Sequence, residues 1–293
     1  MSTANRVLFD APGPRARRRI QIVTVASVVI LVIIVAAALK QLGDHGQLEA
    51  YRWQAFTTVP YLRVLGGGLL GTLKATGMSA VLAFPLGALF ALMRLSTRRP
   101  VRMVATGYIE LFRSIPLLLL IYAFLLALPR YGVNLPVFWK LVVPIVLVMS
   151  AVIAEVFRAG IKALDRGQSE AAEAIGFRYW QSMRLVILPQ ATRLVLPSLI
   201  AQLVTVLKES TLGYAVSYPE LMHQGDFLTA RTHLLFQTFV IVAVIYVVIN
   251  FLLGRLAGWV ERRLSRRPGG AGPRTTQDSQ LTTAPQAGLA PTA

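Results

Sequence analysis

Cysteine is absent from the 293 residues, and histidine occurs only three times. Without cysteine the chain cannot form disulfides, hold an iron–sulfur cluster through thiolates or bind zinc through sulfur. The three histidines, His45, His223 and His233, do not have the spacing of metal ligands. No metal site is therefore predicted.

Charged residues are also scarce, at 15% of the chain, whereas 55% of the residues are hydrophobic and the mean hydropathy is +0.59. An average soluble domain carries roughly 25% charged residues, so this composition indicates a membrane protein. A helix of roughly 20 apolar residues crosses a hydrocarbon core of about 30 Å. We predict an all-α membrane protein with about six transmembrane helices, at residues 20–39, 73–95, 105–128, 140–161, 192–214 and 234–254.

Acidic residues are fewer than basic residues, 13 against 30, so the chain has a net charge of +17. Such an excess could indicate nucleic acid, but most of the basic residues cluster beside alternate ends of the apolar runs. Cationic loops remain on the cytoplasmic side of a membrane protein. We therefore predict a multi-pass membrane protein that contacts lipid, does not bind nucleic acid and has both termini in the cytoplasm.

The chain divides by composition into five parts. The first apolar run is longer than the apolar part of a signal peptide and lacks a small-residue cleavage pattern, so we expect it to remain as a span. The tail has too few apolar residues to offset the entropy of ordering and is predicted to be disordered. The parts are a cytoplasmic segment 1–19, an extra span 20–39, an outer loop 40–66, a five-helix core 67–258 and the tail 259–293.

The longest inner connection, residues 164–190, contains signals for a short helix of its own. Ser169 is a candidate N-cap, and Glu170 and Glu173 favour the positive end of the helix dipole. Gly176 suits the left-handed residue that ends a helix. We predict a helix of about two turns, which would either dock another protein or rest on the lipid surface.

This connection also carries a spaced motif. Glu170-Ala171-Ala172 is followed after three residues by Gly176 and, nine residues later, by an aliphatic residue, any residue and Leu188-Pro189. The motif resembles the signature loop of ABC importer permeases of type I. The resemblance implies that Glu170, Ala171, Ala172 and Gly176 couple the chain to an ATPase.

Further stretches resemble one branch of these permeases, the polar amino acid importers of the histidine, glutamate and glutamine type. They are Gly71-Thr72-Leu73-Lys74, Glu110 to Leu118, Ala154 to Gly160, Arg166-Gly167-Gln168 and Lys208 to Leu212. Two departures are Ser114-Ile115-Pro116, where the family often has Gly-Thr-Pro, and Val152, where it often has tyrosine. The extra first helix and the outer loop most resemble glutamate permeases.

The resemblance implies a location in the bacterial inner (plasma) membrane and four kinds of partner or energy source outside this chain. They are an ATP-binding subunit dimer, a second permease subunit that is identical or related, an extracytoplasmic solute-binding protein, and ATP used by the partner. The chain has no Gly-x-x-x-x-Gly-Lys-Ser/Thr phosphate-binding loop. We therefore expect a transport subunit that is not an enzyme and holds no cofactor of its own.

Among the ionisable residues inside predicted spans, four stand out because they lie away from the ends that carry the basic clusters: Glu110, Arg113, Lys208 and Glu209. Each costs about 2.5 to 3.5 kcal/mol to insert at the membrane centre, so the presence of each needs a physical reason. We predict a substrate pathway in which Arg113 or Lys208 binds a carboxylate and Glu209 binds an ammonium group, with Ser210 as a weaker candidate. The alternative is that these charges neutralise one another, as Glu110 and Arg113 could at i,i+3.

Smaller features have structural explanations. The spacing of Glu155 and Arg158, one turn apart, predicts a salt bridge. Close helix packing is predicted at the glycines Gly66 to Gly68 and Gly71.

Two other function classes, a self-contained transporter and a hydrolase, fit the sequence less well. A self-contained ion-coupled carrier or channel would transport without ATP, and it would favour repeated halves with broken helices, which we do not find. A membrane-embedded hydrolase would need a nucleophile with its base, and no in-span histidine or Gly-x-Ser-x-Gly motif supplies one.

Overall fold

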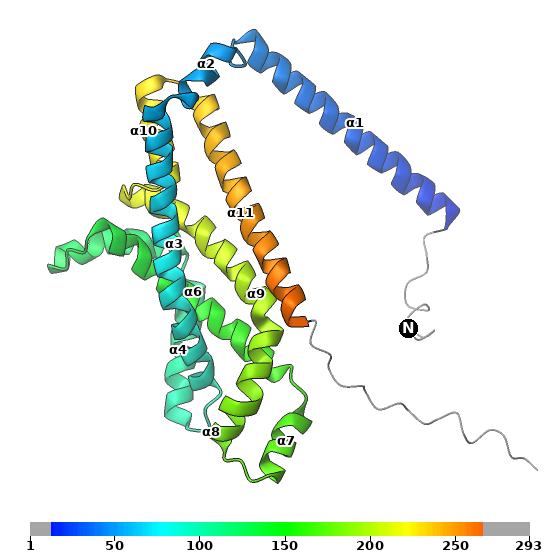
Figure 1. The fold of residues 1–293 in the computed structure, drawn as a ribbon, viewed down its shortest axis with the longest axis vertical. Helices are drawn as coiled ribbons and strands as arrows, with labels where there is room; N and C mark the ends of the chain where they lie inside the picture. The colour runs from blue at the N-terminus through cyan, green and yellow to red at the C-terminus, as the bar shows by residue number, and fades with distance from the viewer. Residues whose placement is uncertain (1–12, 266–293) are drawn as a thin grey trace, which may run out of the picture.

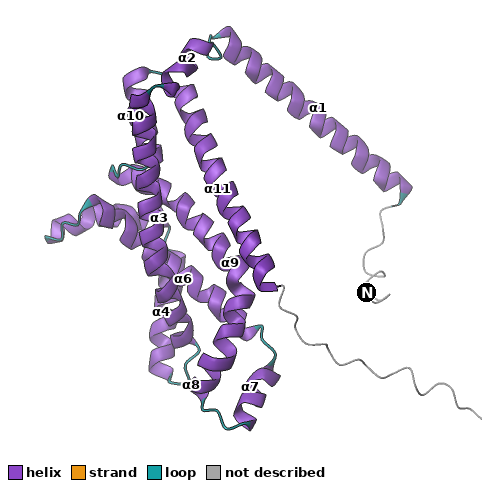
Figure 2. Cartoon of the chain, in the orientation of Figure 1, coloured by secondary structure: helices purple, strands orange, loops and turns teal. Residues whose placement is uncertain are grey.

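The computed structural model describes residues 13–265 of the chain (Figure 1). Over this range every regular element is a helix and no strand is formed (Figure 2). Five helices are long and apolar enough to cross a membrane, and a sixth candidate is a bent pair. The predicted all-α membrane fold is therefore confirmed.

The first helix, α1 (Pro14–Asp44), lies apart from the other helices (Figure 1). None of its residues is buried within the chain. Its apolar surface is thus available to lipid or to a neighbouring protein, as its sequence requires of a span.

Two short helices, α2 (Ala50–Gln54) and η2 (Ala55–Thr57), connect α1 to α3 (Val59–Arg94). We predicted a loop over residues 40–66, but the structure continues α1 to Asp44 and begins α3 at Val59. Thr58 is extended and a proline occupies the first turn, where its fixed φ and missing N–H favour a helix start.

The third predicted span is broken. Helix α4 (Arg99–Ser114) and the segment from α5 (Leu117–Tyr122) through η3 (Ala123–Ala127) and η4 (Leu128–Tyr131) meet at an angle of 96°. Pro116 disfavours a helical conformation at the residue before it, and Ile115 accordingly has φ −84° and ψ 125°. The single run at 105–128 was therefore wrong in this detail.

Helix α6 (Val137–Lys162) is the centre of the bundle and packs against α3 and against α9 (Leu188–Glu209). Its buried apolar side chains include Leu141, Ile145 and Ile153. A Cβ at Gly87 of α3 would lie 2.6 Å from the Ile153 side chain, so the absent side chain allows the two backbones to approach closely.

At one end of the bundle, α9 continues into η6 (Ser210–Val216), and α10 (Leu221–Thr232) then returns against α3. A Cβ at Gly68 would lie 2.9 Å from Leu221 Cα, and one at Gly71 would overlap the Pro219 carbonyl oxygen. The predicted packing role is confirmed for Gly68 and Gly71, but it was wrong for Gly66 and Gly67, where a Cβ would meet nothing within 4 Å. We call this the outer end, following the predicted topology.

The last helix, α11 (Leu235–Ser265), runs beside α9 and α10. The predicted tail 259–293 therefore starts too early, since residues 259–265 are helical. The predicted disorder concerns mainly residues 266–293, which lie outside the described residues.

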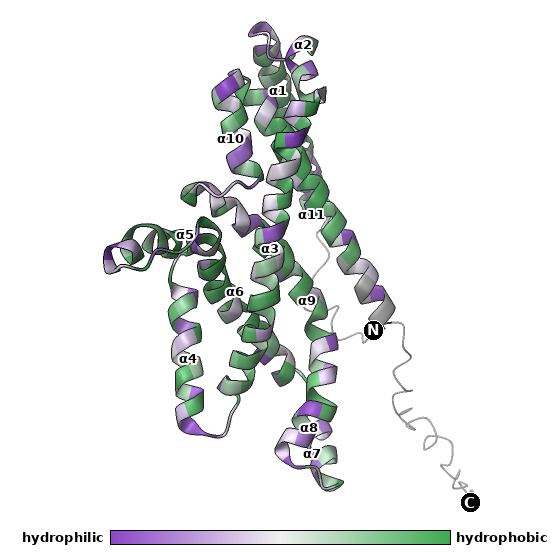
Figure 3. Ribbon diagram, turned by 60° about the vertical axis from the view of Figure 1, so that its left-hand side comes forward, coloured by the Kyte–Doolittle hydropathy of each residue, from purple (hydrophilic) through white to green (hydrophobic). Residues whose placement is uncertain are grey.

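The opposite, inner end carries the long connection. It folds into α7 (Arg166–Ala174), α8 (Tyr179–Ser182) and η5 (Met183–Ile187), and the last leads into α9. Figure 3 shows hydrophilic residues gathered around α7 and α8, whereas the spans are mainly hydrophobic.

Candidate functional sites

Helix α7 at the inner end contains Glu170, Ala171 and Ala172 of the motif, and Gly176 lies two residues beyond its end. Its N-cap is Asp165, whose side chain accepts a hydrogen bond of 2.8 Å from the Gly167 N–H. Ser169 was predicted for this role, but it lies within the helix and donates to the Arg166 carbonyl at 2.8 Å. The helix begins earlier because an aspartate was available to satisfy its first free N–H groups.

The end of α7 agrees with the prediction. Gly176 has φ +84°, and its N–H donates to the Glu173 carbonyl at 2.9 Å, while the Phe177 N–H donates to the Ala172 carbonyl at 3.0 Å. These two bonds satisfy carbonyls that the helix end would otherwise leave free. The nine residues of α7 make about two and a half turns.

The two faces of α7 differ in exposure. Ala172 is buried, with 3% of its surface exposed, whereas Glu170, Ala171 and Gly176 are exposed. Gln190 of α9 also donates to the Gln168 side chain at 3.0 Å, which fixes the helix to the bundle. The chain therefore holds α7 by one face and presents the other.

A cluster of ion pairs, the inner ion cluster, joins α3, α4 and α6 through Arg94, Glu110, Glu155 and Arg158. Arg94 contacts both Glu155 and, at 3.0 Å, Glu110. Arg158 contacts Glu155 at 2.6 Å, so the predicted i,i+3 salt bridge is confirmed.

Glu110 was also suggested as a partner for Arg113 one turn away, and this pair is not formed. The Arg94 side chain reaches Glu110 from the end of a neighbouring helix instead. Arg113 is exposed and has no carboxylate within 4 Å among the described residues. The two in-span charges of α4 are thus separated, with Glu110 in the inner ion cluster and Arg113 outside it.

The two charges at the end of α9 remain unpaired within the described part of the chain. Lys208 is exposed and Glu209 is half-buried, and neither forms an ion pair or a side-chain hydrogen bond with the described residues. Mutual neutralisation among residues 13–265 therefore does not explain them.

Ser210 lies against the bundle. It is fully buried, donates to the Leu207 carbonyl at 2.7 Å and accepts a bond from the Thr76 hydroxyl at 3.4 Å. The Thr211 hydroxyl similarly donates to the Lys208 carbonyl at 2.7 Å. Both hydroxyls satisfy backbone groups, the commoner use of such residues in apolar helices.

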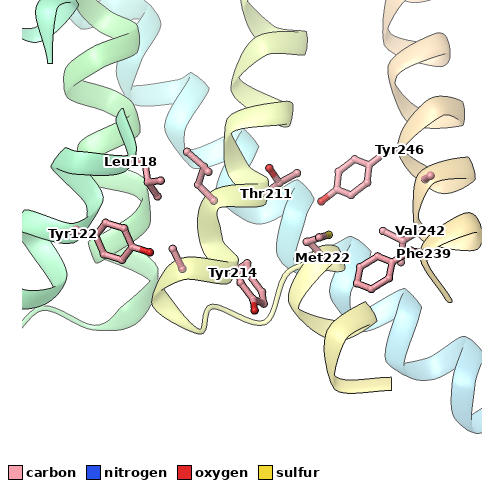
Figure 4. A pocket seen from close by; sticks show the side chains of 11 residues that line it. Leu118, Tyr122, Thr211, Tyr214, Met222, Phe239, Val242 and Tyr246 are labelled. Atoms are coloured by element: carbon pink, nitrogen blue, oxygen red, sulfur yellow. The ribbon is translucent and has the colours of Figure 1, made fainter. Parts of the chain in front are cut away.

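Close to these residues, a cavity of about 500 Å³ lies between α5, η6, α10 and α11 (Figure 4). Its lining is largely apolar and aromatic, with hydroxyl groups from Thr211 and three tyrosines. No predicted in-span charge lines it. The lining residues are Leu118, Tyr122, Thr211, Leu212, Tyr214, Ala215, Met222, Phe239, Val242, Ala243 and Tyr246.

Beside this cavity lies a buried carboxyl group that sequence reasoning missed. Glu220 is fully buried and accepts hydrogen bonds from the N–H groups of Met222 and His223, each at 2.7 Å, and from the Tyr246 hydroxyl at 2.9 Å. Burial raises the pKa of the Glu220 carboxyl, and the two backbone bonds oppose this rise.

The same region bonds α10 to α3. The Leu221 N–H donates to the Thr72 hydroxyl at 3.1 Å, and the Tyr218 hydroxyl donates to the Gly71 carbonyl at 3.1 Å. We call Thr72, Tyr218, Glu220 and Tyr246 the outer polar cluster. In sequence its only signal is a glutamate just before a helix, which is a weak N-cap.

Comparison with known proteins assigns the family. Residues 83–266 match the family described as "Binding-protein-dependent transport system inner membrane component". The chain is 36% identical over 199 residues to the "Probable glutamine ABC transporter permease protein GlnM" of Bacillus subtilis, covering 68% of this chain and 92% of the relative. It is 35% identical over 227 residues to the "Glutamate transport system permease protein GluD" of Corynebacterium glutamicum, covering 76% and 83%.

A solved structure agrees with these relatives. The "Crystal structure of an amino acid ABC transporter with histidines" matches with a TM-score of 0.67 and 35% identity, over 71% of this chain and 97% of that one. Subunits of this family are transport components whose ATPase is a separate subunit. The chain therefore belongs to the inner membrane components of binding-protein-dependent transport systems, as an ABC transporter permease subunit.

Proposed function

We propose that this chain forms the translocation pathway for ATP-driven uptake of a polar amino acid, glutamate or a close relative. The observation that carries the proposal is the pair Lys208 and Glu209, two charges at the end of a span without partners within the described chain. A charge in a membrane span is costly unless it faces a partner or a polar pathway. The names of the relatives, glutamine and glutamate permeases, support the substrate class.

In this proposal the two charges recognise the groups that all α-amino acids share. The Lys208 ammonium binds the α-carboxylate, and the Glu209 carboxylate binds the α-ammonium. Arg113 is exposed and offers a guanidinium, which is suited to bidentate binding of a second carboxylate. An acidic side chain would use that second site, and an amide would not need it.

The energy enters through α7. The transporter would contain two identical or related permease subunits, and each would bind one ATP-binding subunit. The contact is made by the exposed residues Glu170, Ala171 and Gly176. Closure of the ATPase on ATP would move α7, and with it α9 through η5 and the Gln168–Gln190 bond. An extracytoplasmic binding protein delivers substrate at the outer end, and both termini lie in the cytoplasm.

The substrate assignment is tested by uptake into vesicles that contain the chain, its ATPase, its permease partner and its binding protein. Labelled glutamate is challenged with unlabelled glutamine, histidine and arginine. ATP-dependent, glutamate-selective uptake supports the proposal. ATP-dependent uptake of another amino acid would retain the mechanism and change the substrate, whereas uptake without ATP would favour a self-contained carrier.

Glu209→Gln tests the recognition of the ammonium group in the same vesicles. We expect at least a tenfold loss of uptake for every α-amino acid substrate, with Asp226→Asn, a change of an exposed acid on α10, as the control. Loss confined to cationic substrates would place Glu209 at the side chain instead.

Gly176→Val tests the coupling contact. Gly132 offers a matched control because it also has positive φ, +81° against +84°, and also has open space around a new Cβ. Both variants bear similar backbone strain. Loss of uptake with Gly176→Val but not with Gly132→Val supports docking at α7, and equal uptake by the two variants contradicts it.

A further inference from the structure

A second cavity lies at the inner end, where the turn between α3 and α4 faces α8. We call it the inner groove; its volume is about 440 Å³. Leu89, Leu92 and Met93 of α3 and Val101 of α4 form its apolar floor. Leu89 is 50% exposed, so the floor is open to the surroundings of the chain.

The opposite wall of the inner groove is aromatic. Tyr179 and Trp180 of α8 both line it, with ring centroids 5.5 Å apart in an edge-to-face arrangement. The Tyr179 hydroxyl donates to the Leu95 carbonyl at 3.4 Å, which connects the wall to the end of α3. Trp180 is 63% exposed, and tryptophan is enriched at membrane–water interfaces.

The mouth of the inner groove is cationic. The segment 94–102 contains four arginines and no acidic residue. Arg94 is paired with Glu110 and Glu155, but Arg98, Arg99 and Arg102 have no carboxylate within 4 Å among the described residues. Three cations beside the groove thus lack a protein counterion.

Two of these cations are placed at the opening. Arg98 lines the groove together with the hydroxyl groups of Ser96 and Thr97. Arg102 donates to the Ser96 carbonyl at 3.4 Å, which holds its guanidinium beside the same turn. Hydroxyl and guanidinium groups are the donors that a phosphate diester requires.

We propose that the inner groove binds one anionic phospholipid of the cytoplasmic leaflet. Its phosphate lies against Arg98 and Arg102, and an acyl chain follows Leu89 and Leu92 past the Trp180 ring. The occupant must be amphiphilic, because a free phosphate would leave the apolar floor uncovered and a neutral lipid would leave the arginines without a counterion. The site also links α8, which follows the coupling helix, to the end of α3.

The first experiment measures lipid retained by the purified full-length chain, without its ATPase, in native mass spectrometry. Phosphatidylglycerol is compared with phosphatidylcholine. We expect a tightly retained phosphatidylglycerol whose affinity falls by about tenfold or more in the double variant Arg98→Gln/Arg102→Gln. Arg262→Gln is the matched control, since Arg262 is an exposed cation near the inner end of α11, outside the groove.

A second experiment locates the acyl chain by quenching of tryptophan fluorescence. The four tryptophans are Trp53, Trp139, Trp180 and Trp259, so changing the other three to phenylalanine leaves Trp180 alone. Phosphatidylglycerol with brominated acyl chains should quench this fluorescence at a low mole fraction. Leu89→Phe, made in that background, adds no tryptophan and should fill the floor and reduce the quenching while the arginines remain.

Three results would overturn the proposal. They are equal retention of the two lipids, unchanged retention of phosphatidylglycerol by Arg98→Gln/Arg102→Gln, and unchanged quenching by brominated lipid in that double variant. If the double variant keeps its lipid but no longer binds the ATP-binding subunit, the inner groove is a protein-docking surface instead.

Discussion

The two ends of the bundle use carboxyl groups in opposite ways. In the outer polar cluster, the fully buried Glu220 is held by two backbone N–H groups and one phenol, with no cation within 4 Å in the described structure. In the inner ion cluster, two carboxylates share two guanidinium groups, and all four side chains remain partly exposed, from 18% for Glu155 to 65% for Glu110.

This difference has mechanical consequences. A buried acceptor that loses its donors pays its full desolvation cost, so the outer polar cluster favours one fixed arrangement. Partly exposed ions can exchange a protein partner for water at a small cost. We therefore expect the outer end to move as one body with α3 and the inner end to rearrange when α7 is displaced.

The largest effect is expected at the outer end, where the backbone of α3 at Gly71 lies directly against the backbone at Pro219. Gly71→Val should prevent α10 from packing on α3, because a Cβ there overlaps the Pro219 carbonyl oxygen. We expect a loss of about 3 kcal/mol or more in stability, seen as loss of monodisperse protein in size-exclusion chromatography. Gly77→Val on the same helix meets nothing within 4 Å and should have little effect. If the two variants behave alike, the outer end is not rigid.

A medium effect is expected in the inner ion cluster. Glu155→Ala removes the shared partner of Arg94 and Arg158, which should lower the free energy of unfolding by about 2 kcal/mol. Glu110→Ala removes a carboxylate that is 65% exposed and should cost about 0.5 kcal/mol or less. Denaturation midpoints measured at low and high salt check both values. Equal losses would show that exposure does not set the strength of these pairs.

The smallest effect is expected at a single hydroxyl group in the outer polar cluster. Tyr246→Phe removes the donor to Glu220 and should lower stability by about 1 kcal/mol, independently of salt. Tyr122→Phe is the control, because Tyr122 lines the same cavity and its hydroxyl has no hydrogen bond in the described structure. A marked salt dependence of the Tyr246→Phe loss would mean that the outer polar cluster is also ionic.

Features that depend on local sequence were predicted well. The long apolar runs identified the spans, since burial in lipid needs only length and hydropathy. Gly176 identified the end of α7, because its left-handed conformation is local. The break at Pro116 is also local, because proline disfavours a helical conformation at Ile115, but the hydropathy of the run 105–128 does not reveal it.

Features that depend on contacts between distant segments were not predictable in the same way. Glu110 pairs with Arg94, sixteen residues away, and not with Arg113 on its own helix. Which of two arginines a glutamate reaches depends on how the helices cross, and that geometry is absent from spacing along one helix.

The sequence by itself determined that this chain is a helical membrane protein with a separate short helix, α7, at its inner end, because hydropathy and helix capping act over a few turns; the motif that follows the same short range carried the resemblance to ABC permeases. Only the tertiary structure decided that Glu220 is buried beside Tyr246 and that Lys208 and Glu209 lack partners in the described chain. Burial and pairing depend on which surfaces meet. In this bundle, that choice is made by small residues such as Gly71, at which two backbones can come together.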